Sequence, residues 1–285
     1  MPKAPNGPKF SKRTTSRWSK ETMPQTAYHM LEVPRLPPKP RTRSMIVMSE
    51  TCIPLRQTED LIEVAGSLID YAKLTDHAGL IDRHSEAWIR RKIALYNDHG
   101  IPVIPGGIPF QVAVIQDKVN EFLQAVRDLG FAGVEMSEDT MPPLETGYRE
   151  DLIRRALDMG LPVMTEMGRK NVDIPFNADE ICEQILRDVE LGVSKVYLES
   201  AEIQEIFEAD PAALDKIASL GKNEFLLFEL GLQNAQEKAA WLVERYGMDI
   251  NFASVSPADV VPVDAIRRGV HRKAGFSYVT QYGRQ

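Results

Sequence analysis

Glycines recur at nearly equal intervals through most of this 285-residue sequence. Six of them each close an amphipathic stretch and precede a short apolar run, and they are Gly100, Gly130, Gly160, Gly192, Gly221 and Gly247. Glycine readily adopts the left-handed conformation that ends many helices. Short apolar runs that follow such helices are typical of strands buried on both faces. The repeat therefore predicts strands that alternate with helices, as in a parallel sheet.

The apolar runs give eight candidate strands. They cover residues 45–48, 69–73, 101–104, 133–136, 162–164, 195–198, 225–228 and 250–253. Eight strand–helix units predict a closed (β/α)8 TIM barrel, a fold that typically takes about 250 residues. An open, doubly wound α/β sheet is the alternative, but no Gly-x-Gly-x-x-Gly motif follows the first strand. We therefore assign residues 45–285 to an α/β barrel that forms a catalytic domain.

Residues 1–44 have a different composition. They hold eight of the nineteen prolines, ten Lys or Arg residues and two acidic residues, and they show no apolar period. Such a segment cannot bury enough apolar surface to offset the entropy lost on ordering. We predict a flexible, basic, proline-rich N-terminal extension that is mostly irregular. It either decorates the surface or wraps a neighbouring subunit, and we expect a homo-oligomer.

Charge and apolar content argue against several classes of partner. The net charge is −7, and the excess of acidic residues lies after residue 44, so nucleic acid is a poor partner for the body of the chain. No window of about 18 apolar residues predicts a membrane span. The two cysteines make no disulfide framework, and the basic N-terminus lacks an apolar signal region. We therefore expect a cytoplasmic protein without membrane or nucleic-acid partners.

Four consecutive predicted strands end on a glutamate, and these are Glu135, Glu166, Glu199 and Glu229. The carboxyl ends of barrel strands meet at the active-site face, so the four side chains should converge there. An acid among apolar residues is costly to bury unless it is paired or binds a cation. Crowded carboxylates repel one another and attract a divalent metal or lysines. The pattern predicts a metal site, proton chemistry or a network of ion pairs.

Cations lie at the ends of two predicted strands at the same face. Lys73 ends the second strand, where it can act as a general acid, bind an anion or pair with a glutamate. Arg169 and Lys170 follow the fifth strand, where they can hold a phosphate or sulfonate or belong to a solvated loop.

Small and neutral polar residues complete the candidate site. Gly106 and Gly107 end the third strand, where the backbone can approach a ligand closely, although a turn would explain them equally well. Gln233, Asn251 and Ser254 belong to the seventh and eighth units, where barrels often bind phosphate.

In order and spacing, these stretches resemble the phosphosulfolactate synthase family. The resemblance covers about residues 45–275 and is carried by 70–73, 104–107, 129–131, 134–137, 165–170, 228–229, Asn251 and 267–269. It implies a TIM barrel enzyme, classed as a carbon–sulfur lyase, that adds sulfite to phosphoenolpyruvate with Mg²⁺. The product, phosphosulfolactate, enters coenzyme M biosynthesis.

The resemblance and the strand-end positions together give our predicted site, in which small anions are the substrates. The expected catalytic residues are Lys73, Lys170 and Glu229. The expected Mg²⁺ ligands are Glu135, Glu166 and Glu199. The expected substrate-binding residues are Gly106, Gly107, Ser137, Arg169, Gln233, Asn251 and Ser254.

Two stretches differ from the family's enzymes and leave other functions open. Leu74 to His77 follow the second strand where the enzymes tend to have phenylalanine and glycine, and Ser200-Ala201 follow the sixth where they tend to have glycine and arginine. One alternative is an enzyme that combines phosphoenolpyruvate, or a similar phospho-acid, with another nucleophile. The other is a non-catalytic protein of the heat-stress-associated type, which the family also includes.

Overall fold

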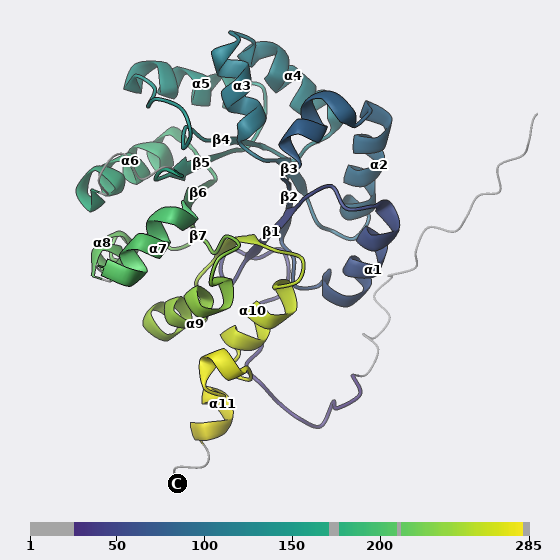
Figure 1. Ribbon diagram of the computed structural model, residues 1–285, viewed down its shortest axis with the longest axis vertical. Coiled ribbons are helices and arrows are strands. Elements are labelled where there is room, and N and C mark those ends of the chain that lie inside the picture. The colour runs from purple at the N-terminus through teal and green to yellow at the C-terminus, as the bar shows by residue number, and fades with distance from the viewer. Residues whose placement is uncertain (1–25, 171–176, 210–211, 282–285) are drawn as a thin grey trace, which may run out of the picture. The chain divides into compact units, whose positions relative to one another are not determined.

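Eight parallel strands form a nearly closed barrel in the computed structural model, which describes residues 26–170, 177–209 and 212–281 (Figure 1). The strands are β1 (Ile46–Glu50), β2 (Tyr71–Leu74), β3 (Val103–Pro105), β4 (Val134–Met136), β5 (Val163–Met167), β6 (Lys195–Leu198), β7 (Leu226–Glu229) and β8 (Phe252–Val255). Each overlaps one of the predicted runs.

Helices alternate with these strands and surround them (Figure 1). They are α1 (Leu55–Ala65), α2 (Glu86–Asn97), α3 (Ile108–Ile115), α4 (Val119–Leu129), α5 (Thr146–Asp158), α6 (Ala178–Leu191), α7 (Ser200–Ala209), α8 (Ala213–Ala218), α9 (Ala235–Tyr246), α10 (Val260–Arg267) and α11 (Ser277–Thr280). Two short helical turns, η1 (Gly79–Arg83) and η2 (Arg272–Ala274), complete the described elements. None of the helices in these ranges is both long and apolar enough to cross a bilayer.

The order of the strands closes the sheet on itself. Neighbours follow the order β3-β2-β1-β8-β7-β6-β5-β4, and the pairs are parallel. A backbone hydrogen bond of 2.8 Å from Ala132 N to Val103 O joins the two outer strands near their beginnings. The predicted TIM barrel is therefore confirmed.

The six recurring glycines mark the ends of helices, as predicted. All six recurring glycines have positive φ. In α4, Gly130 adopts the left-handed conformation directly after the last helical residue, and Val119, Leu123 and Val126 form the buried stripe. The amphipathic period places this stripe against the strands, and the glycine turns the chain back into β4.

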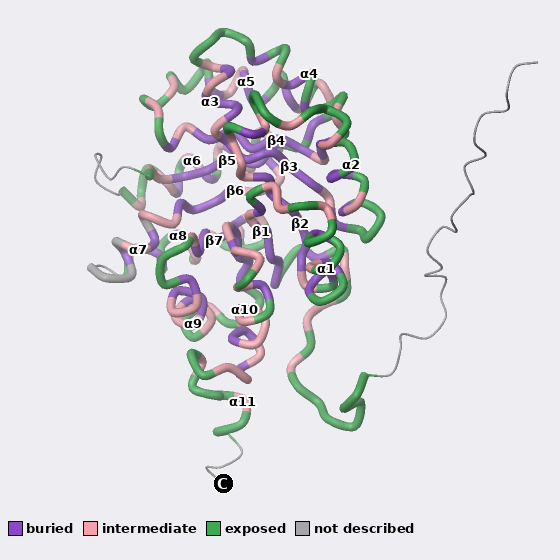
Figure 2. Tube along the Cα trace, turned by 45° about the vertical axis from the view of Figure 1, so that its right-hand side comes forward, coloured by how far each residue is buried: buried purple, intermediate pink, exposed green. Residues whose placement is uncertain are grey.

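The core has an outer and an inner part. The outer part lies between the strands and the helices, and the tube in Figure 2 shows the strands as its most buried elements. The inner part fills the barrel with Val47, Ile104, Met164, Tyr197, Leu227 and Ala253. Because side chains alternate along a strand, the residues two positions further point to the same interior at the carboxyl end. These residues include Glu166, Glu199 and Glu229, so the fold itself brings three of the glutamates together.

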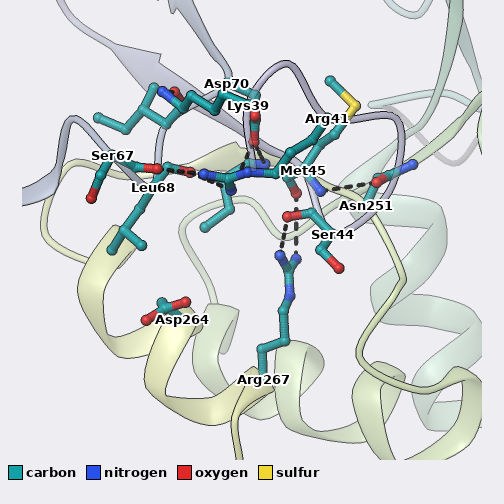
Figure 3. Close-up of polar contacts among 12 residues, drawn as sticks. Lys39, Arg41, Ser44, Met45, Ser67, Leu68, Asp70, Asn251, Asp264 and Arg267 are labelled. Carbon is teal, nitrogen blue, oxygen red and sulfur yellow. Dashed lines mark hydrogen bonds and ion pairs between the residues drawn. The ribbon is translucent and has the colours of Figure 1, made fainter. Parts of the chain in front are cut away.

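The segment just before β1 packs on the amino-terminal end of the barrel. The chain divides into units of 1–34 and 35–285, so residues 35–44 belong to the larger unit. Residues 26–44 contain no helix or strand, and residues 1–25 of the predicted extension lie outside the described part. Lys39 Nζ donates to Gly66 O at 2.7 Å, and Arg41 Nη1 lies 3.3 Å from Asp70 Oδ2 (Figure 3). Both Arg41 and Asp70 are buried.

Arg267, at the end of α10, binds the same end of the barrel. Its guanidinium donates to the carbonyl oxygens of Ser44, Met45 and Ile250, the last at 3.0 Å (Figure 3). Burial is the main reason that the pKa of Arg267 falls to about 10. The side chain thus satisfies backbone carbonyls at the closed end of the barrel, opposite the carboxyl ends of the strands.

Truncation should separate the two parts of the N-terminal region. We expect a protein that begins at residue 35 to keep its free energy of unfolding within about 0.5 kcal/mol of the full chain. A protein that begins at residue 44 should lose about 3–5 kcal/mol, because Asp70 remains buried without Arg41. Urea unfolding of the two truncated proteins measures the difference, and equal midpoints would contradict the structural role of residues 35–43.

Candidate active site

The carboxyl ends of the strands surround a cavity of about 810 Å³. Its lining contains nine of the residues that the sequence predicted, and these are Lys73, Gly106, Gly107, Glu135, Lys170, Glu199, Glu229, Gln233 and Ser254. The cavity therefore lies where a TIM barrel carries its active site, and the charged groups around it form two clusters.

The first cluster centres on Lys73, which is 5% exposed. Its ammonium lies 3.0 Å from Glu135 Oε2, 2.9 Å from Glu229 Oε1 and 4.8 Å from the centroid of the Tyr197 ring. Burial alone would lower the pKa of Lys73, but the surrounding carboxylates outweigh it and raise the pKa well above its ordinary value. Lys73 is thus a fixed positive charge at the floor of the cavity.

Hydrogen bonds hold the two carboxylates of this cluster in place. Gly107 N donates to Glu135 Oε1 at 2.9 Å, and Ser254 Oγ donates to Glu229 Oε1 at 2.6 Å. A Cβ atom at residue 107 would lie 2.1 Å from Ser137 Oγ, so only glycine fits there. Glu135 was predicted as a metal ligand, but its Oε1 accepts from Gly107 N and its Oε2 pairs with Lys73 Nζ.

The second cluster consists of Asp139, Glu166 and Glu199, which are all buried. One carboxylate oxygen from each lies within 4.8 Å of those of the other two. Lys170 Nζ contacts Asp139 Oδ2, and it lies 3.5 Å from Glu199 Oε2 and 4.0 Å from Glu166 Oε1. Burial would lower the pKa of Lys170, but these three carboxylates raise it above its ordinary value.

The pKa values of two acids in the second cluster shift in opposite directions. Burial, followed by the charges of Glu229 and Glu135, raises the pKa of Glu166 well above its ordinary value. Burial also acts to raise the pKa of Glu199, but a hydrogen bond from Glu166 and the charge of Lys170 lower it overall. Burial and the nearby acids therefore favour the protonated form of Glu166, whereas the surroundings of Glu199 favour its ionised form.

The donor set of this cluster suits a small, hard cation. Glu166 Oε2 and Glu199 Oε2 are buried and accept no hydrogen bond from a donor in the described residues, although Lys170 Nζ lies 3.5 Å from Glu199 Oε2. Carboxylate oxygens are the ligands that Mg²⁺ prefers. The side chain of Lys170 is 47% exposed, so it has room to withdraw when a cation enters between the three acids. Asp139, Glu166 and Glu199 are thus the residues that could hold a metal.

Three of the predicted substrate-binding residues do not line the cavity, and these are Ser137, Arg169 and Asn251. Ser137 lies behind Gly107 and accepts a hydrogen bond of 2.9 Å from Gln111 Nε2. Arg169 Nη1 donates to Met141 O at 3.0 Å, in the loop after β4. Ser137 and Arg169 therefore contact the residues around the cavity and not its interior.

The placement of Asn251 requires a correction. Asn251 directly precedes β8, so it lies at the amino-terminal end of the barrel, opposite the cavity at the carboxyl ends of the strands. Its Oδ1 accepts from Met45 N at 2.9 Å, and its Nδ2 donates to the carbonyls of Asn223 and Leu226 at 3.0 and 3.1 Å. The prediction grouped Asn251 with the phosphate-binding residues because it belongs to the eighth unit, but a residue at the start of a parallel strand lies at the amino-terminal end of the barrel. Asn251 instead joins backbone segments at the closed end.

Two residues of the site were missing from the prediction. Asp139 lies three residues after β4, so an acid just beyond a strand end was its signal. Lys238 lines the cavity from the start of α9 and is 2% exposed. It shares a buried stripe with Ala235, Ala239 and Leu242, and a lysine on an apolar stripe was the signal that could have identified it.

Comparisons with solved structures agree with the barrel. A putative dihydrodipicolinate synthetase from Pseudomonas aeruginosa superimposes with a TM-score of 0.55 and 16% identity, over 82% of this chain and 80% of that one. A dihydrodipicolinic acid synthase family protein from E. coli K12, in complex with pyruvate, gives a TM-score of 0.51 and 15% identity over 82% and 78%. At this level of identity the similarity establishes the fold alone.

Sequence comparison gives the family. The phosphosulfolactate synthase of Methanocaldococcus jannaschii is 30% identical over 238 residues, which span 80% of this chain and 92% of that protein. The phosphosulfolactate synthase of Methanothermobacter thermautotrophicus is 26% identical over 254 residues, 86% of this chain and 95% of the other. The profile of the (2R)-phospho-3-sulfolactate synthase family matches residues 34–273. With its barrel and its cavity of acids and lysines, this chain belongs to the (2R)-phospho-3-sulfolactate synthase family.

Proposed function

We propose that this protein catalyses the Mg²⁺-dependent addition of sulfite to phosphoenolpyruvate to give phosphosulfolactate, as a lyase-type enzyme that supplies coenzyme M biosynthesis. The observation that carries the proposal is the group of three buried carboxylates around Lys170, of which Glu199 lines the main cavity together with Lys170. Family membership supports the same reaction.

In this proposal Asp139, Glu166 and Glu199 hold Mg²⁺. Octahedral Mg²⁺ commonly takes one or two protein carboxylates and fills its shell with water and substrate oxygens, so the three acids need not all be direct ligands. The bound ion would supply positive charge for the substrate carboxylate as that group becomes an enediolate. The acids that do not bind directly would orient water or Lys170.

Lys73 contributes binding of an anion. Both reactants are anions, and the ammonium of Lys73 remains charged because Glu135 and Glu229 raise its pKa. Its distances to these carboxylates fix its position before the substrate arrives, so no reorganisation is needed when negative charge develops. Glu229, held by Ser254, acts here by positioning Lys73.

Lys170 is the proton donor in this proposal. The sulfur lone pair of sulfite forms a bond to C3 of phosphoenolpyruvate, and the C2–C3 double-bond electrons move towards the carboxylate. Lys170 then transfers a proton to C2, which completes the addition, and no group leaves. Its half-exposed side chain can reach solvent, from which the proton is replaced.

The consumption of phosphoenolpyruvate with sulfite, or with another nucleophile, tests the reaction. We expect the purified protein to consume phosphoenolpyruvate when sulfite and Mg²⁺ are both present, and to form a C–S bond that nuclear magnetic resonance detects. Consumption of phosphoenolpyruvate with another nucleophile, but not with sulfite, would support the first alternative. A protein that consumes phosphoenolpyruvate under none of these conditions would contradict the proposal and favour the non-catalytic alternative.

A further inference from the structure

Lys238 is a buried cation that the proposed reaction does not use. It lines the cavity from the fourth position of α9 and is 2% exposed. Its ammonium forms no hydrogen bond or ion pair with another residue in the described parts of the chain. Glu199 and Glu229 are the acids whose charges act on it, but Ser200 donates to Glu199 Oε1, and Lys73 and Ser254 donate to Glu229 Oε1.

An ammonium group in this position is costly without an anion. Removing a charge from water carries a penalty of several kcal/mol unless close partners offset it. Burial is accordingly the largest influence on the pKa of Lys238 and lowers it. The side chain borders a cavity and is not enclosed by apolar groups on all sides, so a ligand in the cavity can supply the missing negative charge.

The start of α9 adds a second attraction for an anion at the same wall. Residues 231–233 line the cavity directly before this 12-residue helix. Asn234 caps the helix in the left-handed conformation, and its side chain makes no capping hydrogen bond. The first amide groups of a helix and its dipole both favour a negatively charged group, phosphate above all.

Gly231 keeps the approach to Lys238 open. A Cβ atom on residue 231 would lie 3.8 Å from Lys238 Nζ and 2.8 Å from Ser200 Oγ. The φ of Gly231 is 63°, which also disfavours other residues. The absence of a side chain therefore leaves space in front of the ammonium.

We propose that Lys238 and the amino terminus of α9 form a subsite for a phosphoryl dianion. A terminal phosphate offers three oxygens, so the ammonium and the helix amides can bind it together. Lys170 follows β5 and Lys238 lies after β7, so the two cations flank the end of β6. The phosphate would thus bind on the β7 side and leave the rest of the substrate directed to the carboxylates. This assignment rests on the proposed function for the identity of the whole substrate.

Binding of inorganic phosphate to the full chain tests the subsite by isothermal titration calorimetry. We expect Lys238→Met to weaken phosphate binding at least about tenfold, and Lys238→Arg to stay within about threefold of the parent. Phosphoenolpyruvate should lose affinity in parallel, while pyruvate, which lacks the phosphoryl group, should bind the parent and Lys238→Met equally. Lys216→Met, at an exposed ion pair with Asp179, is the matched control.

The outcomes separate this inference from the proposed reaction. Equal phosphate affinity in the parent and Lys238→Met, or no phosphate binding by the parent, would overturn the subsite. Phosphate binding that depends on Lys238 in a protein that does not turn over phosphoenolpyruvate with sulfite would keep the subsite and reject the reaction. Melting curves verify that the variants fold, and Lys238→Gln replaces Lys238→Met if the methionine variant does not.

Discussion

Replacing Lys170 with methionine is expected to lower the rate of phosphosulfolactate formation by about 10²–10⁴-fold, the usual contribution of a general acid. The methionine keeps the length of the side chain but cannot deliver a proton to C2. The half-exposed position of Lys170 means that its loss leaves no packing defect. Turnover with saturating phosphoenolpyruvate, sulfite and Mg²⁺ measures the effect.

A second readout distinguishes proton transfer from electrostatic binding. In D₂O the parent should exchange the C2 hydrogen of phosphosulfolactate, whereas Lys170→Met should not. Lys170→Arg keeps the charge beside Asp139 and Glu199 but is too weak an acid to replace the lysine. A methionine variant that retains normal turnover and C2 exchange would show that Lys170 only neutralises the three acids.

Replacing Glu166 with glutamine is expected to remove most of the response to Mg²⁺. The parent should melt at a higher temperature when Mg²⁺ is added, because a ligand that binds only the folded state stabilises it. Glu166→Gln should lose that increase and at least about 10² of the Mg²⁺-dependent rate, since one of three buried carboxylates is gone. Melting curves and rates over a series of Mg²⁺ concentrations give both quantities.

The same variant should show a characteristic pH dependence without metal. The pKa of Glu166 in the folded state lies well above 4.5, its ordinary value in an unfolded chain. The ionisation of Glu166 therefore lowers the stability of the folded state as the pH rises above about 4.5. Glu166→Gln should therefore be the more stable protein at neutral pH, and the difference should vanish below about pH 4, where Glu166 is protonated in both states.

Two control variants test whether the loss of the Mg²⁺ response is specific to Glu166. Glu50→Gln removes another buried strand-end acid, which lies 2.8 Å from Lys92 Nζ, so it should lower stability and leave the Mg²⁺ response intact. Glu135→Gln should do the same, because Glu135 pairs with Lys73. If Glu166→Gln responds to Mg²⁺ as the parent does, the three acids form an ion-pair cluster with Lys170.

Local patterns in the sequence were sufficient to predict the barrel. The residues that end helices and those that fill strands act over a few positions, so Gly130 and the apolar stripe of α4 could be interpreted without a structure. The polar ends of the strands followed from alternation along each strand, which is why most predicted site residues line the cavity.

The sequence by itself determined that four glutamates and two lysines would meet at one end of an α/β barrel. Only the tertiary structure decided their partners, because the stagger between strands sets the depth of each side chain. That stagger pairs Glu135 with Lys73 and groups Glu166 and Glu199 with Asp139, where we propose that Mg²⁺ binds. Asn251 lies at the closed end because it precedes β8, and its side chain joins backbone segments there. Lys238 entered the site because helix α9 packs its buried stripe against the barrel, a contact between elements that no local pattern contains.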